Sequence, residues 1–458
     1  MANAPEATLR RFQSPAARQS AAMDELVRQA VFGAPEAREQ ARWLIWEIGQ
    51  EAGVRPASIH ELYLARGRGE VRPFTTPAMN IRVLSYDSAR AVFRAAKRLD
   101  VGALICEIAR SEIGYTEQRP AEYVAVMTAA ALREGFTGPL FIQGDHVQVN
   151  AKKYAVDAET ELQAIRTLIE EELHAGFYNI DVDTSTLVDL SQATLDAQQR
   201  VNYDRAAELT KFIRDREPEG VTVSVGAEIG EVGGKNSDVH ELKAFMDGYG
   251  RALARLGPYA GISKISVQTG TSHGGVVLPD GSIAKVALDL DALKALSADA
   301  RSQYGLGGAV QHGASTLPPD AFGNFPKCEA IEIHLATNFQ NIVFDHPKLP
   351  ADLRRELQQW VKAECKDEWK KGDTEEQFYY KSRKKAIGPF KQRMWDLPAE
   401  VRGAIAGDLE KNFAFLFEQL RVTGTRAITD RFVTPPLQSH SQPRPVAVAA
   451  PDDLEAGE

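Results

Sequence analysis

Residues 140–146 read Leu-Phe-Ile-Gln-Gly-Asp-His, an apolar run of strand length that leads directly into polar, chemically active side chains. The same design recurs along the middle of the chain, where short apolar runs alternate with longer helix-like segments. Eight runs are predicted as strands: Phe74–Asn80, Ala103–Ile108, Leu140–Gln143, Tyr178–Val182, Val221–Ala227, Ile262–Val267, Ala309–Gln311 and Ala330–Leu335. Strict alternation of strand and helix indicates a parallel sheet, and eight repeats fit a closed (β/α)8 TIM barrel better than an open doubly wound sheet.

Helical periodicity defines the connections and both ends of the chain. The connecting helices are predicted at Ser88–Leu99, Tyr123–Glu134, Thr160–Ala175, Asp204–Asp215, Asp238–Arg255 and Leu290–Leu296. The predicted organisation is an N-terminal helical extension (1–72), the barrel (73–345), a C-terminal helical segment (346–432) and a tail (433–458). The tail is rich in Pro, Ser, Ala and acidic residues, a composition typical of disorder.

Composition narrows the classes of function. The net charge of −9 argues against nucleic acid as a partner, because phosphate backbones need a basic face. Cys106, Cys328 and Cys365 form neither a disulfide framework nor a CxxC pair. The sequence lacks an apolar leader and a long uninterrupted apolar stretch, so we expect a cytoplasmic protein with no signal peptide and no membrane span.

The residues that follow the predicted strands point to a metal. In a (β/α)8 barrel the active site lies at the C-terminal ends of the strands. His146, His273 and His312 follow the third, sixth and seventh strands, each beside small or glycine residues. A lone histidine is usually a core residue, but three imidazoles that face one axis form a catalytic zinc site.

Two further groups at the strand ends fit chemistry on a phosphorylated substrate. Asp145 directly precedes His146, and a carboxylate beside a divalent cation can move protons on a bound substrate; its other role would be to orient an imidazole. Gly274 and Gly313, with Ser315 and Thr337, suit a phosphate group, because small residues let backbone N–H groups converge on an anion.

At these residues the chain resembles the class II ketose-bisphosphate aldolases, which act on fructose and tagatose bisphosphates. The resemblance runs from about Phe74 to Asn341 and rests on several motifs in order. These are Asp145-His146, Val182-Asp183-Thr184-Ser185, Ala227-Glu228-Ile229-Gly230 with Gly233-Gly234, Thr271-Ser272-His273-Gly274, His312-Gly313-Ala314-Ser315 and Leu335-Ala336-Thr337.

The resemblance implies an enzyme that cleaves a ketose bisphosphate to dihydroxyacetone phosphate and an aldehyde. It implies Zn²⁺ on His146, His273 and His312, with Asp145 as acid–base residue. Asp183 and Glu228 match carboxylates that form a second, inner metal position. The implied substrate contacts are Asn80, Gly274, Gly313, Ala314, Ser315, His334, Ala336 and Thr337. A homo-oligomer, a dimer or larger, is also expected.

The chain departs from the family at several positions. The family has asparagine where His334 stands, and acidic residues where Lys235 and Asn236 follow Gly233-Gly234. Neither a protonated lysine nor an amide is a suitable base, so we expect Glu231 or Asp238 to handle the carbon-bound proton, with Glu231 nearer the strand.

Two alternatives stay open. Residues 143–150, and Glu107 through Thr116, also resemble the companion subunit of tagatose-bisphosphate aldolase, a barrel that supports an enzyme without performing its chemistry. The other alternative is a metal-dependent lyase or isomerase that acts on a different sugar.

Overall fold

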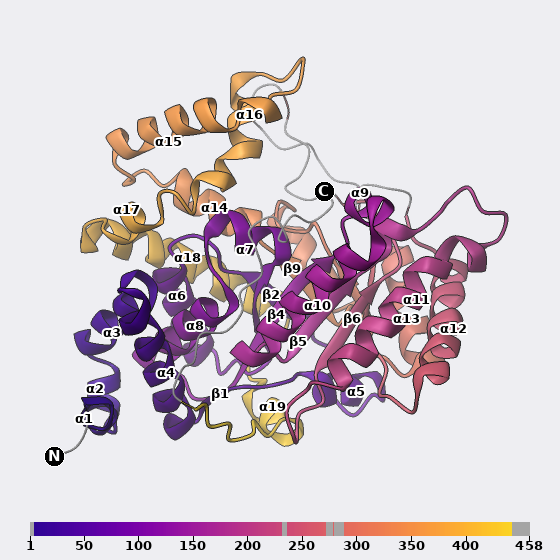
Figure 1. Ribbon diagram of the computed structural model, residues 1–458, viewed down its shortest axis with the longest axis horizontal. Helices are drawn as coiled ribbons and strands as arrows, with labels where there is room; N and C mark the ends of the chain where they lie inside the picture. Colours follow the sequence, from indigo (N-terminus) through magenta and orange to yellow (C-terminus); the bar gives the residue numbers. More distant parts are fainter. Residues whose placement is uncertain (1–3, 231–235, 272–277, 279–287, 442–458) are drawn as a thin grey trace.

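The computed structural model describes residues 4–230, 236–271, 278 and 288–441. Its centre is a closed barrel of eight parallel strands, β2 to β9 in sequence order, with helices around it (Figure 1). The β2–β9 pairing, with Thr76 opposite Glu332, closes the barrel. The predicted (β/α)8 barrel is therefore confirmed.

All eight predicted strands are present. They are β2 (Thr76–Asn80), β3 (Ile105–Ala109), β4 (Gly138–Gln148), β5 (Asn179–Asp183), β6 (Ser224–Glu228), β7 (Lys264–Val267), β8 (Ala309–Gln311) and β9 (Glu332–Leu335). The main difference is in β4, which was predicted to end at Gln143. It continues through Gly144, Asp145 and His146, so these residues belong to the strand rather than to the loop after it.

The helices of the barrel wall are α6 (Ser85–Arg98), α7 (Arg110–Thr116), α8 (Pro120–Glu134), α9 (Ala151–Val156), α10 (Ala158–Ala175), α11 (Leu195–Arg214), α12 (Val239–Leu256), α13 (Leu290–Tyr304) and α14 (Thr337–Phe344). The predicted helices all occur, but α11 starts well before Asp204. Its first half is polar and carries no apolar periodicity. The Thr194 side chain nevertheless accepts from the N–H of Ala197 and caps the helix there.

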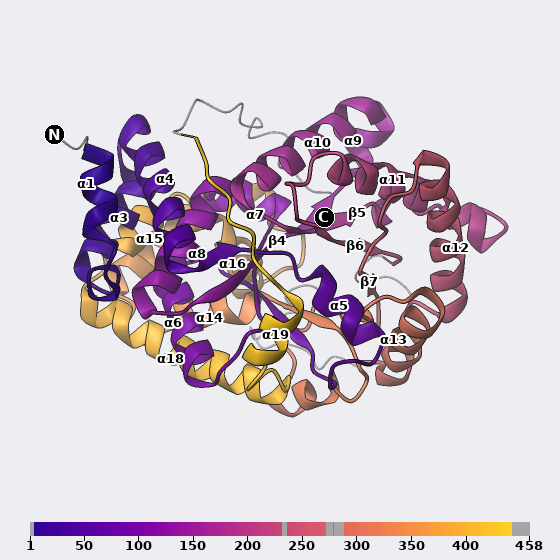
Figure 2. The ribbon, with the colours of Figure 1, turned by 90° about the horizontal axis from the view of Figure 1, so that it is seen from below.

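The N-terminal segment consists of α1 (Ala4–Arg11), α2 (Pro15–Arg18), α3 (Ala21–Phe32), α4 (Pro35–Ala52), β1 (Val54–Pro56) and α5 (His60–Gly67). β1 was not predicted, because three residues are too short to show a period; it pairs in parallel with β4, Val54 opposite Gly138. α5 lies across the N-terminal end of the barrel (Figure 2), and the hydroxyl of its buried Tyr63 donates to Glu332 inside.

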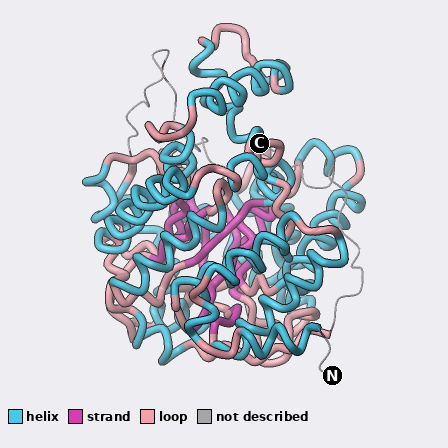
Figure 3. The backbone as a smooth tube through the Cα atoms, turned by 90° about the vertical axis from the view of Figure 1, so that its left-hand side faces the viewer, coloured by secondary structure: helices cyan, strands magenta, loops and turns pink. Residues whose placement is uncertain are grey.

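The C-terminal segment consists of α15 (Ala351–Glu364), α16 (Glu375–Ser382), α17 (Lys391–Trp395), α18 (Ala399–Gln419) and α19 (Arg426–Phe432). α15 and α16 form a lobe that projects beyond the barrel, seen from two sides in Figures 1 and 3. α18 packs along α6, where Arg94 and Arg98 both pair with Glu410. No helix in the described part of the chain is long and apolar enough to cross a membrane.

The first part of the tail is ordered, although its composition predicts disorder. Residues 433–441 lie against α4, where the indole N–H groups of Trp43 and Trp46 donate to the carbonyls of His440 and Gln438. The His440 ring also stacks on Trp46, with 3.9 Å between ring centroids. Partners on α4 therefore hold a segment that has no periodicity of its own. Residues 442–458 lie outside the described residues.

The interior of the barrel is charged rather than filled with branched apolar side chains. Lys264 of β7 has no solvent exposure, and its ammonium lies 2.5 Å from Glu332 Oε1, 2.6 Å from Gln143 Oε1 and 2.9 Å from Asp181 Oδ1. Burial opposes ionisation of Glu332, but the Lys264 charge prevails and lowers the pKa of that carboxyl to about 2. A buried cation therefore joins β4, β5, β7 and β9 across the barrel.

We expect Lys264→Met to lower the free energy of unfolding by about 3–5 kcal/mol, since it leaves buried carboxylates without a compensating charge. Urea unfolding measures the change. The difference in unfolding free energy between Lys264→Met and the parent should become smaller as the pH falls towards about 2, the pKa of Glu332. Protonated carboxyls carry no charge, so they do not need the ammonium. Lys243→Met is the matched control: Lys243 pairs with Asp247 on the exposed face of α12, where the cost is about 0–1 kcal/mol. Equal losses of unfolding free energy in Lys264→Met and Lys243→Met would contradict this account of the barrel interior.

Candidate active site and metal centre

A β-bulge in β4 creates the centre of the site. Gly144 lies opposite Ile180 of β5, whereas Val147 lies opposite Val182, so β4 contains one extra residue at this point. His146 there adopts a left-handed backbone with φ of +39°, which is uncommon for a residue other than glycine. Consecutive side chains of a regular strand point to opposite faces. The bulge instead lets Asp145 and His146 both reach the site, with 3.9 Å between Asp145 Oδ1 and His146 Nε2.

Three strands bring together side chains that could hold a metal ion. His146 of β4, Glu228 of β6 and His312 after β8 each offer one donor atom, and these atoms all lie within 4.8 Å of one another. The rings of His146 and His312 are 4.2 Å apart between centroids. Glu228 and His312 are buried and His146 is nearly so, so the cluster lies within the barrel mouth.

The electrostatics of this cluster fit a cation. Burial raises the pKa of Glu228 well above its ordinary value, and the Asp183 charge adds to the effect. Burial would lower the pKa of His146, but Asp145, Asp183 and Glu228 raise it well above its ordinary value. Two imidazoles beside two buried carboxylates form a donor set of the kind that holds a divalent transition metal. The residues present therefore fit the metal that the sequence predicts. The third predicted ligand, His273, lies outside the described residues.

Asp183 makes a defined contact with His146, one of the predicted ligands. Its Oδ2 lies 3.0 Å from His146 Nδ1 and accepts from Gln148 Nε2 at 2.7 Å, while Oδ1 accepts from the Ser185 hydroxyl at 2.7 Å. The carboxylate is thus held by its own neighbours and can fix the orientation of the His146 ring, as outer partners of metal-binding histidines do. Glu228, by contrast, is itself within the cluster.

The predicted phosphate-binding residues meet on two adjacent loops. Gly313, Ala314 and Ser315 follow β8, and Ala336 and Thr337 follow β9 at the start of α14. The N–H of Ala336 donates to Ser315 Oγ at 2.6 Å, which joins the two loops directly. Gly313 has a φ of +65°, so this turn favours a residue without a side chain. Gly274 lies outside the described residues.

Asn80 and His334 are engaged within the protein. The Asn80 amide donates to Glu112 of α7, which also binds Arg82. His334, at the end of β9, contacts Asp145 and Glu332 through its two ring nitrogens, at 3.0 and 2.7 Å. Asn80 ends β2 and His334 lies one residue before the end of β9, and the Asn80 amide nitrogen and both His334 ring nitrogens contact other side chains.

Of the two candidate loop acids, Asp238 and Glu231, the structure describes only Asp238. Asp238 caps α12, where its side chain accepts from the backbone N–H groups of His240 and Glu241. It is therefore committed to the helix N-terminus. Glu231, the first choice from the sequence, lies outside the described residues, as does Lys235.

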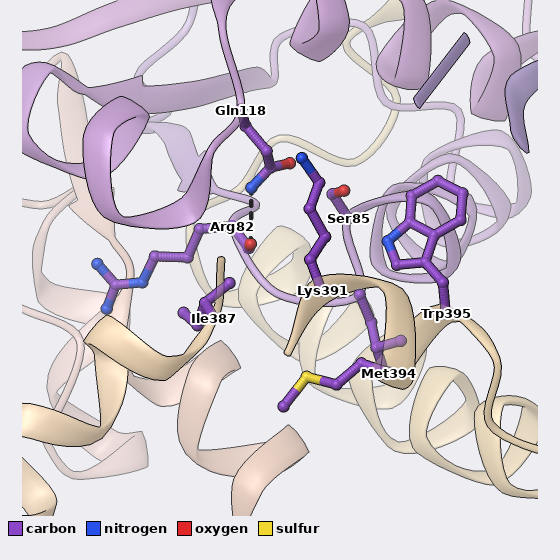
Figure 4. Close-up of a pocket in the computed structure, with 8 residues that line it drawn as sticks. Arg82, Ser85, Gln118, Ile387, Lys391, Met394 and Trp395 are labelled. Carbon is purple, nitrogen blue, oxygen red and sulfur yellow. Dashed lines mark hydrogen bonds between the residues drawn. The ribbon is translucent and has the colours of Figure 1, made fainter. Parts of the chain in front are cut away.

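A small cavity beside α6 is too small to be the substrate site. It holds about 10 Å³ and lies between α6 and the helices after residue 386, where Gln118 Nε2 donates to the Arg82 carbonyl (Figure 4). A water molecule alone needs about 10–15 Å³, so no sugar fits there. This cavity is therefore not the place of the chemistry.

Sequence reasoning missed the polar residues beneath the site. Glu107, Asp181, Lys264 and Glu332 are all buried inside the barrel, in contact with one another or with His334. The available signal was a single charge within each apolar run, as in Ile-Cys-Glu-Ile at 105–108. A charged residue there has no solvent to face and needs a partner of opposite charge.

Comparisons with known proteins agree with this geometry. The sequence profile of class II fructose-bisphosphate aldolases matches residues 71–394. The chain belongs to this family. Members depend on a metal, so the family and the cluster of His146, Glu228 and His312 point to the same kind of centre.

Solved structures show how far the fold of this class II aldolase family member is shared. A probable tagatose 6 phosphate kinase from Sinorhizobium meliloti 1021 is 16% identical, with a TM-score of 0.51 over 83% of this chain and 96% of that one. The fructuronate-tagaturonate epimerase UxaE from Cohnella laeviribosi is 12% identical, with a TM-score of 0.51 over 86% of both chains. A fructose-bisphosphate aldolase from Campylobacter jejuni is 15% identical, with a TM-score of 0.47 over 81% and 98%. No curated protein matches the sequence.

We expect His146→Ala and His312→Ala to weaken binding of a divalent metal, because each removes a direct ligand. The loss should exceed the about 10–100-fold that removal of an outer hydrogen-bond partner costs. Mass-spectrometric metal analysis after dialysis against a graded chelator measures it. His240→Ala is the control, since His240 is exposed on α12. Full metal content in both site variants would contradict the assignment.

Proposed function

We propose that this chain is a zinc-dependent aldolase that reversibly cleaves a ketose bisphosphate to dihydroxyacetone phosphate and an aldehyde. The observation that carries the proposal is the position of Asp145, whose carboxylate lies beside His146 at the edge of the metal-ligating cluster. A base beside a metal-activated ketone is the arrangement that aldol cleavage needs. Membership of the class II aldolase family supports it.

In this proposal His146, His273 and His312 hold the zinc, and Asp183 and Glu228 line a second, inner position. When bound, the metal supplies Lewis-acid polarisation of the substrate carbonyl. Asp145 takes the proton from the hydroxyl whose carbon becomes the aldehyde, and the carbon–carbon bond then breaks. Glu231 returns a proton to the carbon next to the carbonyl. Ser315 Oγ and the N–H of Ala336, which already lie together, receive the phosphate with the loops around them.

A second candidate is a metal-dependent lyase or isomerase on another sugar. It is favoured by His334, whose ring nitrogens both face carboxylates, whereas the family's asparagine at this position contacts the substrate. The supporting, non-catalytic subunit is less well supported, because the ligating side chains are present and close together. A homo-oligomer stays a prediction.

The direct test is an aldol-cleavage assay on a panel of ketose bisphosphates and the matching monophosphates. We expect turnover of a bisphosphate that a chelator abolishes and added zinc restores. Epimerised or isomerised sugar without cleavage would favour the second candidate. Zinc-loaded protein that leaves every substrate unchanged would contradict the proposal and favour the non-catalytic subunit.

Exchange of a carbon-bound hydrogen tests Glu231. We expect Glu231→Gln to slow hydrogen exchange of dihydroxyacetone phosphate in deuterated water by about 10²–10⁴-fold, the usual contribution of an acid–base residue. Asp238→Asn is the matched control, because Asp238 caps α12 and asparagine caps a helix equally well. Proton NMR follows the exchange. Undiminished exchange in Glu231→Gln would remove this residue from the mechanism.

A further inference from the structure

His334 occupies an unusual position between the site and the barrel interior. It is the third of the four residues of β9 and is 6% exposed. Its Nδ1 lies 3.0 Å from Asp145 Oδ1 and 3.2 Å from Glu107 Oε2, and its Nε2 lies 2.7 Å from Glu332 Oε1. Both ring nitrogens therefore face carboxylates. One of these is the carboxylate beside the metal cluster, and another belongs to the charged interior.

These contacts define what the ring does. An ionised carboxylate can only accept hydrogen bonds, and the Glu332 carboxylate next to Lys264 keeps a pKa of about 2, so it accepts from Nε2. The second ring nitrogen, Nδ1, lies within hydrogen-bond distance of Asp145 Oδ1. The imidazole thus bridges Asp145 and Glu332.

Glu332 is itself fixed from below. Its Oε1 receives Lys264 Nζ at 2.5 Å and Gln143 Nε2 at 3.0 Å, and its Oε2 accepts from the Tyr63 hydroxyl. Residues from β4, β7 and α5 therefore set the place of the acceptor that holds His334. Such a fixed acceptor leaves the imidazole little freedom to turn towards a substrate.

Asp145, by contrast, lies in the bulge of β4, next to a residue with a left-handed backbone. A carboxylate in a bulge lacks the regular strand geometry that would set its direction. A hydrogen bond to one of its oxygens supplies that direction, because hydrogen bonds weaken steeply when donor and acceptor are not aligned. Bases that act on a substrate are commonly oriented by a third group in this way.

We propose that His334 is a positioning residue that orients the Asp145 carboxylate for proton transfer, with Glu332 holding His334 in turn. This rests on the proposed function, because it assigns Asp145 the role of base. In the family, the asparagine at this position contacts the substrate. In this chain, His334 makes a contact inside the protein instead. His334 acts only through Asp145.

A double-mutant cycle in the zinc-loaded enzyme tests the proposal. Asp145→Asn should lower kcat by about 10²–10⁴-fold. His334→Asn should lower kcat by about 10–100-fold, with little change in KM and full metal content. The double variant should be no slower than Asp145→Asn, because a group that acts through another contributes nothing once that other is lost. His346→Asn, at a buried histidine of the α14 end, is the control and should retain parent activity.

Three results of the cycle would overturn the proposal. Multiplicative losses in the double variant would mean that His334 acts independently of Asp145. A raised KM with unchanged kcat would make His334 a substrate contact, and loss of zinc in His334→Asn would make it part of the metal centre. If His334→Asn does not fold, His334→Gln against His334→Leu replaces it: the amide donor should retain more kcat than the apolar side chain, and equal losses would overturn the proposal.

Nitrogen NMR of the histidine rings separates this proposal from the proposed function, since it needs no turnover. Among the nine histidines of the unsubstituted, zinc-loaded protein, we expect one ring nitrogen that makes the hydrogen bond between His334 and Asp145. Its signal should vanish in His334→Asn and shift in Asp145→Asn. A signal that is unchanged in Asp145→Asn would overturn the positioning role even in an active aldolase. The expected signals in a protein without aldol cleavage would refute the proposed function alone and leave the pairing in place.

Discussion

The ammonium group of Lys264 is the interaction on which the barrel interior depends. It has no solvent contact and lies within hydrogen-bonding distance of Glu332, Asp181 and Gln143, which come from three other strands. Several buried acids near one another would repel and would lose their hydration, so they require a cation among them. Burial and the nearby Asp145 charge raise the pKa of Glu107 to about 8. Lys264 balances the charge of the carboxylates that it contacts.

This charged interior explains how the site above it is organised. Metal ligands and a base need fixed directions, and strands give more precise placement than loops. Lys264 binds Glu332, and Glu332 holds His334. His334 in turn contacts Asp145, and Asp183 contacts His146. The bulge in β4 is what brings Asp145 and His146, adjacent in sequence, to one site. An interior of packed branched side chains would support the barrel but would offer no such contacts.

Much of this could be predicted from the sequence, for identifiable reasons. Alternating apolar runs and helical segments predict the barrel, and strand ends collect His146, His312 and Glu228, because parallel strands end at one edge. Three features could not be predicted. The extension of β4 depends on a bulge with a left-handed His146, which no local pattern encodes. The pairing of Lys264 with acids far away in sequence depends on closure of the barrel. The order of residues 433–441 depends on Trp43 and Trp46 of α4, nearly 400 positions away in the chain.

The central claim is that one metal ion lies at the mouth of the barrel on imidazole ligands, above a charged interior that holds no metal. Anomalous diffraction from crystals of the zinc-loaded protein, collected at the zinc edge, tests this most directly. The account predicts one strong peak about 2.0–2.1 Å from the ring nitrogens of His146, His273 and His312. The donor atoms of Asp145, Asp181, His312 and His334 also lie within 4.8 Å of one another, deeper in the barrel. A peak in that cluster, with His334 bound to the ion, would contradict the account.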